Sequence, residues 1–283
     1  LTPETAKKFA ALGAVVAVEE GAGLAAAGLI LQLFLRNPLA SPDITGLTHS
    51  GVLCVVLAGV FLSGMSQATT ITLSLLGSTT GLMIMLWLNR GAFFSPVRLA
   101  LTGIALTAIT STATPIVFAL SANQSTDALM WLSGTTYTAT LPMALGYALL
   151  SLLLMATVWL TWRAMNLLQL GNQWAISLGL NLQRARLLLL LIASAFSGLA
   201  VALVGGITFI GLMAPHAARL LGLSNHQQLI PITLLLGACL MVWADLAAQT
   251  LMHPYELPAG LLVSLLGGLY FIGLMSVGIR IQK

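Results

Sequence analysis

Charged residues are scarce in this sequence: only 6% of its 283 residues are Asp, Glu, Lys or Arg, whereas 58% are hydrophobic. Soluble domains carry about 25% charged residues, so this number of charges cannot cover a water-exposed surface. The scarcity excludes a soluble enzyme and a nucleic-acid-binding protein, and it makes the formal net charge of +4 a guide to membrane topology. The composition predicts an integral membrane protein.

Several motifs that carry chemistry are missing as well. The two cysteines, Cys54 and Cys239, both lie in apolar runs, which favours neither a disulfide nor a metal site. There is no GxxxxGK[ST] phosphate loop and no HExxH motif, so the chain does not bind ATP in the Walker manner and does not resemble an intramembrane metalloprotease. The four histidines are far apart, without metal-ligand spacing. We expect no catalytic residues, no metal and no cofactor.

Long uncharged runs fill most of the chain. Two of them, Ile44–Asn89 and Leu187–Ala218, are longer than the roughly 20 apolar residues of one helical span, and they lack the alternation of an outer-membrane barrel. Turn signals divide the runs into one all-α, polytopic transmembrane bundle over residues 1–283. The two pieces beside Gly205-Gly206 could instead form one bent span. The nine candidate helices are Ala14–Leu35, Leu47–Leu62, Ala68–Leu88, Val97–Leu120, Leu141–Trp162, Leu187–Val204, Ile207–Leu221, Leu229–Leu251 and Pro258–Val277.

Basic residues orient this bundle. On an alternating topology the loops on one side carry every Lys and Arg from Arg36 onward, and the opposite loops carry none. The positive-inside rule makes the basic side the cytoplasm, so the C-terminus lies inside. Lys7 and Lys8 would then lie outside, which predicts a further helix upstream of Leu1.

Acidic residues near the start of the chain leave two alternatives. Glu19 and Glu20 occur where the first span should continue, and carboxylates are costly there. Either they face a water-filled region or the span begins after them. Residues 1–20 are therefore the least secure part of the topology, and we expect them to be a truncated or atypical N-terminus. Asp245 lies near an outer span end rather than at the midplane, which disfavours proton coupling. Glu19 and Glu20 nevertheless keep a stand-alone, ion-coupled secondary transporter as an alternative.

The longest polar-flanked stretch on the cytoplasmic side is residues 163–186. It includes Gly-Asn-Gln-Trp-Ala-Ile-Ser-Leu-Gly-Leu at 171–180, which predicts a short helix with a glycine stop. Such a helix, parallel to the membrane, could dock a cytosolic partner. It could also be a plain interfacial connector, and composition does not choose between the two.

Motifs spread over residues 21–277 share their order and spacing with one transporter family. A helix ending in Gln32 precedes Asn-Pro-Leu-Ala at 37–40, and Gly-Gly-Ile-Thr-Phe-Ile-Gly-Leu at 205–212 runs into Ala-Pro-His at 214–216. Together they resemble the permeases of binding-protein-dependent ABC importers for iron–siderophores, haem and cobalamin. The sequence at 213–219 is more similar to ferric-hydroxamate permeases. Further matching segments are 95–106, 131–135, 244–246, 256–260, Gly267 and Tyr270-Phe271.

The resemblance implies a ten-helix transporter subunit of the bacterial cytoplasmic (inner) membrane, of which this chain holds nine helices. It implies no enzymatic activity of its own, because a separate pair of cytosolic ATPases hydrolyses ATP. The other implied partners are the lipid bilayer, a periplasmic substrate-binding protein and a second permease subunit, or a second half of a fused one. The implied cargo is an iron–siderophore, with ferric hydroxamate as the first candidate and haem or cobalamin as alternatives.

The resemblance also implies roles for individual residues. The docking positions for the binding protein are Gln249 and Glu256. Where the family often has arginines, this chain has Ala-Ala-Leu-Gly at 10–13 and Gln249, so this half is not expected to dock through arginine–carboxylate pairs. Asn172 and Gln173 replace acidic residues that are common in the family. The ATPase-coupling set is Gly171, Asn172, Gln173, Trp174, Ala175, Ser177, Leu178 and Gly179.

A second set concerns the translocation pathway. Its three glycines fit either tight helix packing or a bend that shapes the pathway. Pro215 and His216, near the cytoplasmic end, fit a structural kink better than a ligand contact. The full pathway and helix-bend set is Gly205, Gly206, Gly211, Pro215 and His216.

Overall fold

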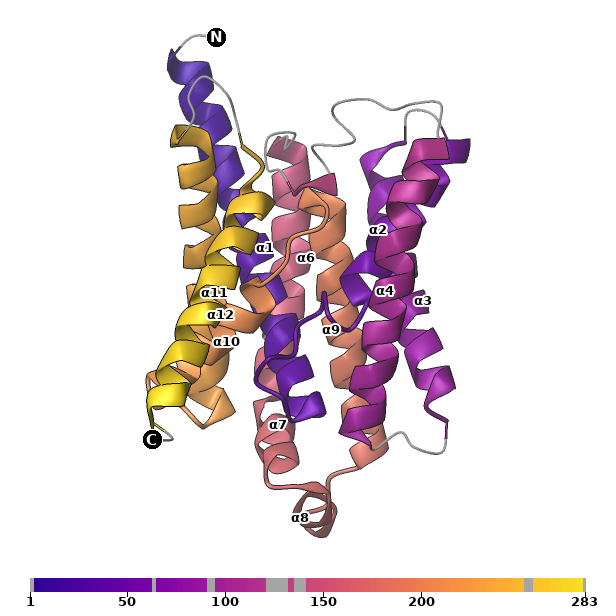
Figure 1. The fold of residues 1–283 in the computed structure, drawn as a ribbon, viewed down its shortest axis with the longest axis vertical. Coiled ribbons are helices and arrows are strands. Elements are labelled where there is room, and N and C mark those ends of the chain that lie inside the picture. The colour runs from indigo at the N-terminus through magenta and orange to yellow at the C-terminus, as the bar shows by residue number, and fades with distance from the viewer. Residues whose placement is uncertain are drawn as a thin grey trace.

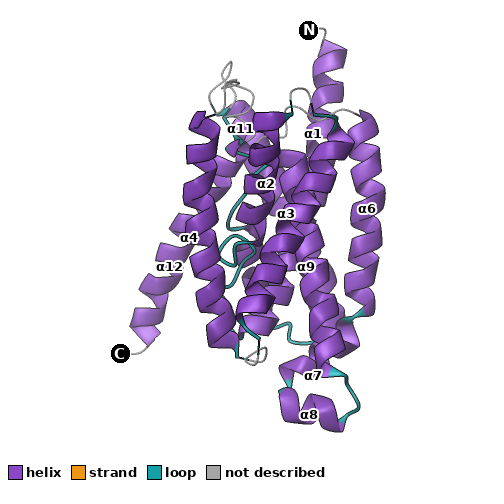
Figure 2. Cartoon of the chain, turned by 90° about the vertical axis from the view of Figure 1, so that its right-hand side faces the viewer, coloured by secondary structure: helices purple, strands orange, loops and turns teal. Residues whose placement is uncertain are grey.

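The computed structural model of the chain describes residues 3–62, 65–90, 95–120, 132–134, 141–251 and 257–281. These residues form a helical bundle whose long helices run side by side (Figures 1 and 2). The helices are α1 Pro3–Leu35, α2 Leu47–Phe61, α3 Gln67–Leu88, α4 Pro96–Leu120, α6 Leu141–Leu160, α7 Trp162–Gln169, α8 Asn172–Ser177, α9 Leu182–Val204, α10 Ile210–Leu220, α11 His226–Thr250 and α12 Ala259–Ile281.

Each of the nine predicted ranges overlaps one of these helices, so the predicted fold class is confirmed. By length and hydropathy, five described helices can cross a membrane, or six if α6 and α7, bent by 47° at their junction, count as one span. The segments α7 and α8 lie at the end of the bundle opposite to the start of α1 (Figure 1). That end carries Arg36, Arg163, Arg184 and Arg219, as the positive-inside reading requires.

Two of the crossings are only partly helical. α2 has 15 residues and α10 has 11, which at about 1.5 Å per residue gives roughly 22 and 16 Å, short of a hydrocarbon core of about 30 Å. The remaining depth is covered by the non-helical segments 36–46 and 205–209, which run inside the bundle (Figures 1 and 2). Irregular backbone is tolerated at this depth where protein surrounds it. The predicted helix 207–221 is therefore wrong at its start, because its first three residues belong to such a segment.

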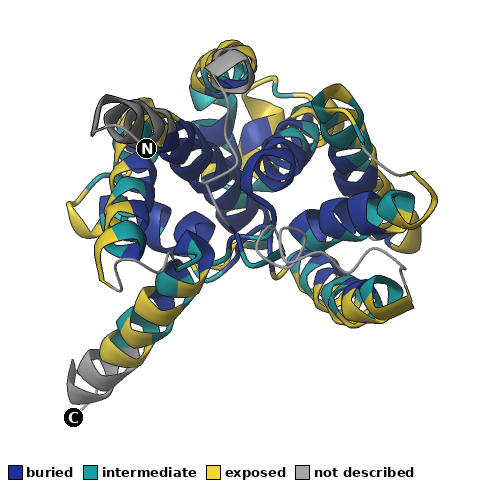
Figure 3. Ribbon diagram, turned by 90° about the horizontal axis from the view of Figure 1, so that it is seen from above, coloured by how far each residue is buried: buried dark blue, intermediate teal, exposed yellow. Residues whose placement is uncertain are grey.

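Close glycine contacts hold α1 in the centre. A Cβ added at Gly28 would stand 1.8 Å from the Gly211 carbonyl oxygen, and one at Gly21 would stand 2.2 Å from the Gly237 carbonyl oxygen. Small residues permit this approach, which is how helices associate in lipid without a hydrophobic driving force. Most described residues in the second half of α1 and in α9 are buried. The view from above shows α12, which leads to the C-terminus, standing out from the bundle (Figure 3).

Glu19 and Glu20 of α1 are inside the bundle. Glu19 is 9% and Glu20 2% exposed, and Asp245 of the neighbouring α11 is 5% exposed. The helix α1 is continuous from Pro3 through both glutamates, and its candidate membrane span, Gly13–Leu35, includes them.

Candidate functional site

The short helix α8 lies at the end of the bundle that the positive-inside rule assigns to the cytoplasm, and two glycines with positive φ bound it. Gly171 precedes it with φ of 106°, and Gly179 follows its last turn with φ of 84°. These values are strained for other residues, so glycine is required at both ends. The structure therefore contains the predicted short helix with a glycine stop.

The surface of α8 is apolar and open. Ala175 is fully buried and seats the helix on the bundle, whereas Trp174 is 66% exposed and Ile176 and Leu178 are each 59% exposed. The polar side chains beside them are also outward, with the Ser177 hydroxyl donating to the Gln173 carbonyl oxygen at 3.0 Å. Exposed apolar side chains on a helix that is itself seated on the bundle indicate a candidate interaction site.

One arginine ties α8 to the bundle. Arg186, in the first turn of α9, donates from Nη2 to Asn172 Oδ1 at 2.7 Å, and its Cζ lies 5.8 Å from the centre of the Phe34 ring in α1. Arg36 lies close by, since a Cβ at Gly171 would stand 3.7 Å from its Nη2. Sequence reasoning counted Arg186 only as a topological charge and missed this contact, because its partners are 14 and 152 positions away in the chain.

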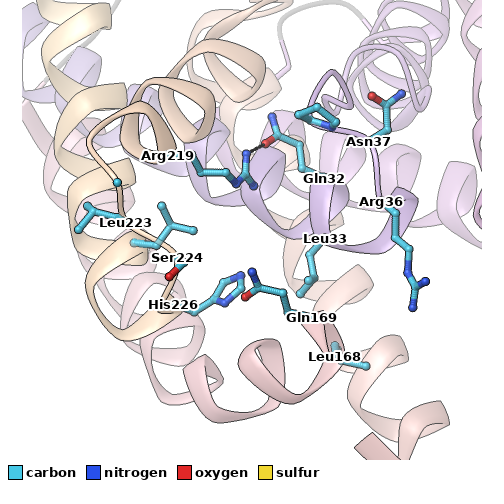
Figure 4. A pocket seen from close by; sticks show the side chains of 13 residues that line it. Gln32, Leu33, Arg36, Asn37, Leu168, Gln169, Arg219, Leu223, Ser224 and His226 are labelled. Carbon is cyan, nitrogen blue, oxygen red and sulfur yellow. Dashed lines mark hydrogen bonds between the residues drawn. The ribbon is translucent and has the colours of Figure 1, made fainter. Parts of the chain in front are cut away.

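A cavity of about 470 Å³ opens next to this contact, between the end of α1, α7 and the α10–α11 turn. On its wall Arg219 donates to Gln32 Oε1 (Figure 4). His226 also lines the cavity, and its Nδ1 lies 2.8 Å from Asn166 Oδ1. Gln32 Nε2 donates to the carbonyl oxygens of Gly211 and of the next residue at 3.3 Å each, which joins α1 to α10.

The two partly helical crossings meet at Asp43. Its Oδ2 accepts the backbone N–H of Phe209 at 3.1 Å and the Ser41 hydroxyl at 3.2 Å. Phe209 is the N-cap residue of α10 and has a φ of 70°. Its side chain has no polar atom, so a cap hydrogen bond at this end has to come from another residue. Carboxylates are favoured at helix N-termini, where backbone N–H groups are unsatisfied. Asp43 was not among the sequence-derived candidates, because an acidic residue in a loop carries no local signal of burial.

The three pathway glycines have different surroundings. Gly205 ends α9 with φ of 84°, whereas a Cβ at Gly206 would meet nothing closer than 3.7 Å. Gly211 is tightly packed, with Pro42 Cδ only 2.7 Å and the Leu24 carbonyl oxygen 2.9 Å from a Cβ built there. Gly205 therefore occupies the bend and Gly211 a helix contact.

The remaining predicted residues lie apart from these glycines. Pro215 is buried inside α10, and the next residue, His216, has Nδ1 2.6 Å from the Tyr270 hydroxyl of α12. Gln249 donates to Asp245 at 2.9 Å within α11, near its outer end. Glu256 lies outside the described residues. Within the described part of the chain, no three His, Cys, Asp or Glu side chains are arranged to hold a metal ion.

Residues 8–276 match the FecCD transport family. The chain belongs to this family. It is 37% identical over 275 residues to the hemin transport system permease protein HmuU of Yersinia pestis, covering 92% of this chain and 80% of HmuU. It is 36% identical over 262 residues to the iron(3+)-hydroxamate import system permease protein FhuB of Salmonella typhimurium, covering 92% of this chain and 38% of FhuB.

Solved structures place this FecCD permease in the same group. At 30% identity it matches an inward-facing ABC transporter assigned to the metal-chelate type, with a TM-score of 0.84 over 94% of this chain and 86% of that one. The protein is therefore a multi-pass permease of the bacterial ABC importers for iron chelates or haem, and it is not itself an enzyme. This assignment confirms the predicted family and replaces the secondary-transporter alternative.

Proposed function

We propose that this FecCD permease carries a ferric siderophore of the hydroxamate class inward, driven by a cytosolic ATPase that docks on α8. The observation that carries the docking is the open apolar surface of Trp174, Ile176 and Leu178 on a helix seated by the buried Ala175. Although α8 has only 6 residues, its exposed apolar side chains can insert into a groove on a partner, as the apolar side chains of helical recognition segments do.

The docking is expected to be apolar rather than ionic. Asn172 and Gln173 bring no charge to α8, and the exposed side chains of residues 172–178 are either apolar (Trp174, Ile176 and Leu178) or neutral and polar (Gln173 and Ser177). Buried aromatic anchors dominate the energy of such interfaces. The matching surface on the ATPase is accordingly a pocket for an aromatic ring, and its association should depend little on salt.

Co-purification tests this docking. The permease is expressed with its cognate ATPase and captured by a tag on the permease, and Trp174→Ser should lower the retained ATPase by about tenfold or more. Leu221→Ser is the matched control, because Leu221 is 66% exposed at the same end of the bundle but outside α8. Equal retention of the ATPase by both variants would refute docking on α8.

A second permease unit is proposed to cover α4 and α12. Between these helices a groove of about 420 Å³ is lined by Ala100 and Ile104 of α4, Gly268 and Phe271 of α12, and Phe209. Leu265, Leu269 and Ile272 of α12 are also exposed. A facing helix from a second unit would fill the groove and enclose a pathway between the two units; a binding protein would load that pathway from the outer side.

The cargo proposal is supported by FhuB, whose name specifies iron(3+)-hydroxamate import, and by the Met-Ala-Pro-His-Ala-Ala-Arg sequence at 213–219. HmuU, at similar identity, is named for hemin transport. Uptake by the assembled importer should therefore be measured with a ferric hydroxamate, haem and cobalamin side by side. Saturable uptake of the ferric hydroxamate alone is expected, and uptake of haem or cobalamin in its place would refute the cargo while leaving the permease assignment intact.

A further inference from the structure

We propose that Arg186 latches α8 to α1, and that α1 carries the displacement of α8 to α10 and so to the broken crossing, which is the partly helical crossing formed by residues 205–209 and α10. The latch is defined as Arg186, Asn172 and Phe34. The inference rests on the proposed docking of an ATPase at α8, and it makes Arg186 and Asn172 positioning residues for coupling.

The chain connections of α8 are poorly suited to transmit force. Glycines with left-handed backbone stand at both of its ends, Gly171 and Gly179, and a Cβ at Gly179 would meet no described atom within 4 Å. Glycine permits large changes in backbone dihedral angles, so a displacement of α8 could be taken up at Gly171 and Gly179 without moving the neighbouring helices. Transmission then requires a contact that bypasses both joints.

The latch is such a contact. Arg186 is 9% exposed, donates to Asn172 Oδ1 at 2.7 Å and stacks over Phe34 with 5.8 Å between its Cζ and the ring centre. A hydrogen bond from a charged group is about twice as strong as a neutral one, and the cation–π contact adds to it. One side chain of α9 thus holds the first residue of α8 and the last turns of α1.

The next step along α1 is rigid. Gln32 is 3% exposed and stands two residues before Phe34 on the same helix. It donates to the carbonyl oxygens of Gly211 and Leu212 at 3.3 Å each and accepts from Arg219 at the other end of α10. Since Gly28 also meets Gly211 with no space for a Cβ, α1 and α10 have little freedom to slide past each other.

The path ends at the broken crossing. Phe209, which starts α10, is held by Asp43 through its N–H, and a Cβ at Gly267 of α12 would stand 2.4 Å from its ring. Thr208 and Ser264 hydroxyls lie 2.8 Å apart and add a second tie to α12. A displacement that enters at α8 therefore reaches the helices that line the proposed pathway through packed contacts alone.

The test compares substrate transported per ATP hydrolysed in proteoliposomes holding the complete importer. Arg186→Gln and Asn172→Ala should each lower this ratio by roughly fivefold or more, while ATP hydrolysis and ATPase association persist. Asn172→Asp should keep the ratio, because a carboxylate still accepts the Arg186 hydrogen bond. The control is Arg184→Gln, which removes the same charge from an exposed side chain two residues away. The double variant Arg186→Gln, Asn172→Ala should be no worse than either single one.

The alternatives are distinguishable. A wild-type ratio in Arg186→Gln or Asn172→Ala overturns the latch, as does an Asn172→Asp variant as impaired as Asn172→Ala. If Arg186→Gln fails to fold, Asn172→Ala decides alone, because it truncates a half-buried side chain on a surface helix. The proposed function fails separately, if the unmodified permease retains no ATPase at all.

Discussion

The carboxylate of Asp43 should be the main stabiliser of the broken crossing, and removing it is the sharpest test of the fold. Asp43→Ala leaves the Phe209 N–H without its acceptor, and an unsatisfied buried donor costs about 1–3 kcal/mol. The lost charge at the start of α10 adds about 0.3–1 kcal/mol. The sum is about 1.3–4 kcal/mol, which at about 2–4 °C per kcal/mol corresponds to a drop in Tm of roughly 3–16 °C.

Asp43→Asn separates the acceptor from the charge. Its side-chain carbonyl can still accept the Phe209 N–H, so only the helix-terminal charge effect is lost, and about 1 kcal/mol or less is expected. Thermal unfolding in one mild detergent, followed by intrinsic fluorescence, measures all variants. Ser111→Ala serves as the control, because its hydroxyl bonds only to its own helix at Ala108. The reasoning is refuted if Asp43→Ala unfolds within about 2 °C of Ser111→Ala, or if the Asn variant is as unstable as the Ala variant.

Two further substitutions, the first with a control variant, test the packing and the buried acids. Gly28→Ala should abolish the α1–α10 contact and the yield of folded protein, because its Cβ would collide with the Gly211 carbonyl oxygen. The control is Gly146→Ala, whose new Cβ has no described atom within 4 Å. This control should leave the size-exclusion profile unchanged and the Tm unchanged or slightly higher. Glu20→Gln should leave the Tm unchanged or raise it, because neither Glu20 carboxyl oxygen has a hydrogen-bond partner in the described structure. Ionised carboxyls are costly in a bundle interior, and this interior also holds Asp245. A fall in Tm of several degrees would show that the carboxyl makes a necessary contact.

Hydropathy located the helices, but it could not show how two of the crossings are completed. Apolar residues read the same whether their backbone is helical or extended, so Ile207 and Thr208 were assigned to a helix that begins only at Ile210. Gly205-Gly206 gave a local signal of a break. The segment 36–46 gave a turn signal but no sign that it lies inside the bundle.

The contacts that organise the candidate site join distant parts of the sequence. Asp43 and Phe209 are 166 positions apart, and Gln32 and Gly211 are 179 apart. A single sequence carries no record of such pairings. The short helix α8, in contrast, was predicted because its ends are marked by glycine and its length is set locally.

The central claim is that this permease is a passive bundle, moved from the cytoplasmic side through α8. Uptake of a ferric hydroxamate into liposomes measures it most directly, with the complete importer, with the importer lacking residues 172–177, and with the permease chain alone. We expect ATP-dependent uptake only in the first preparation. Uptake by the permease chain alone, or uptake that a proton gradient sustains without ATP, would contradict the claim.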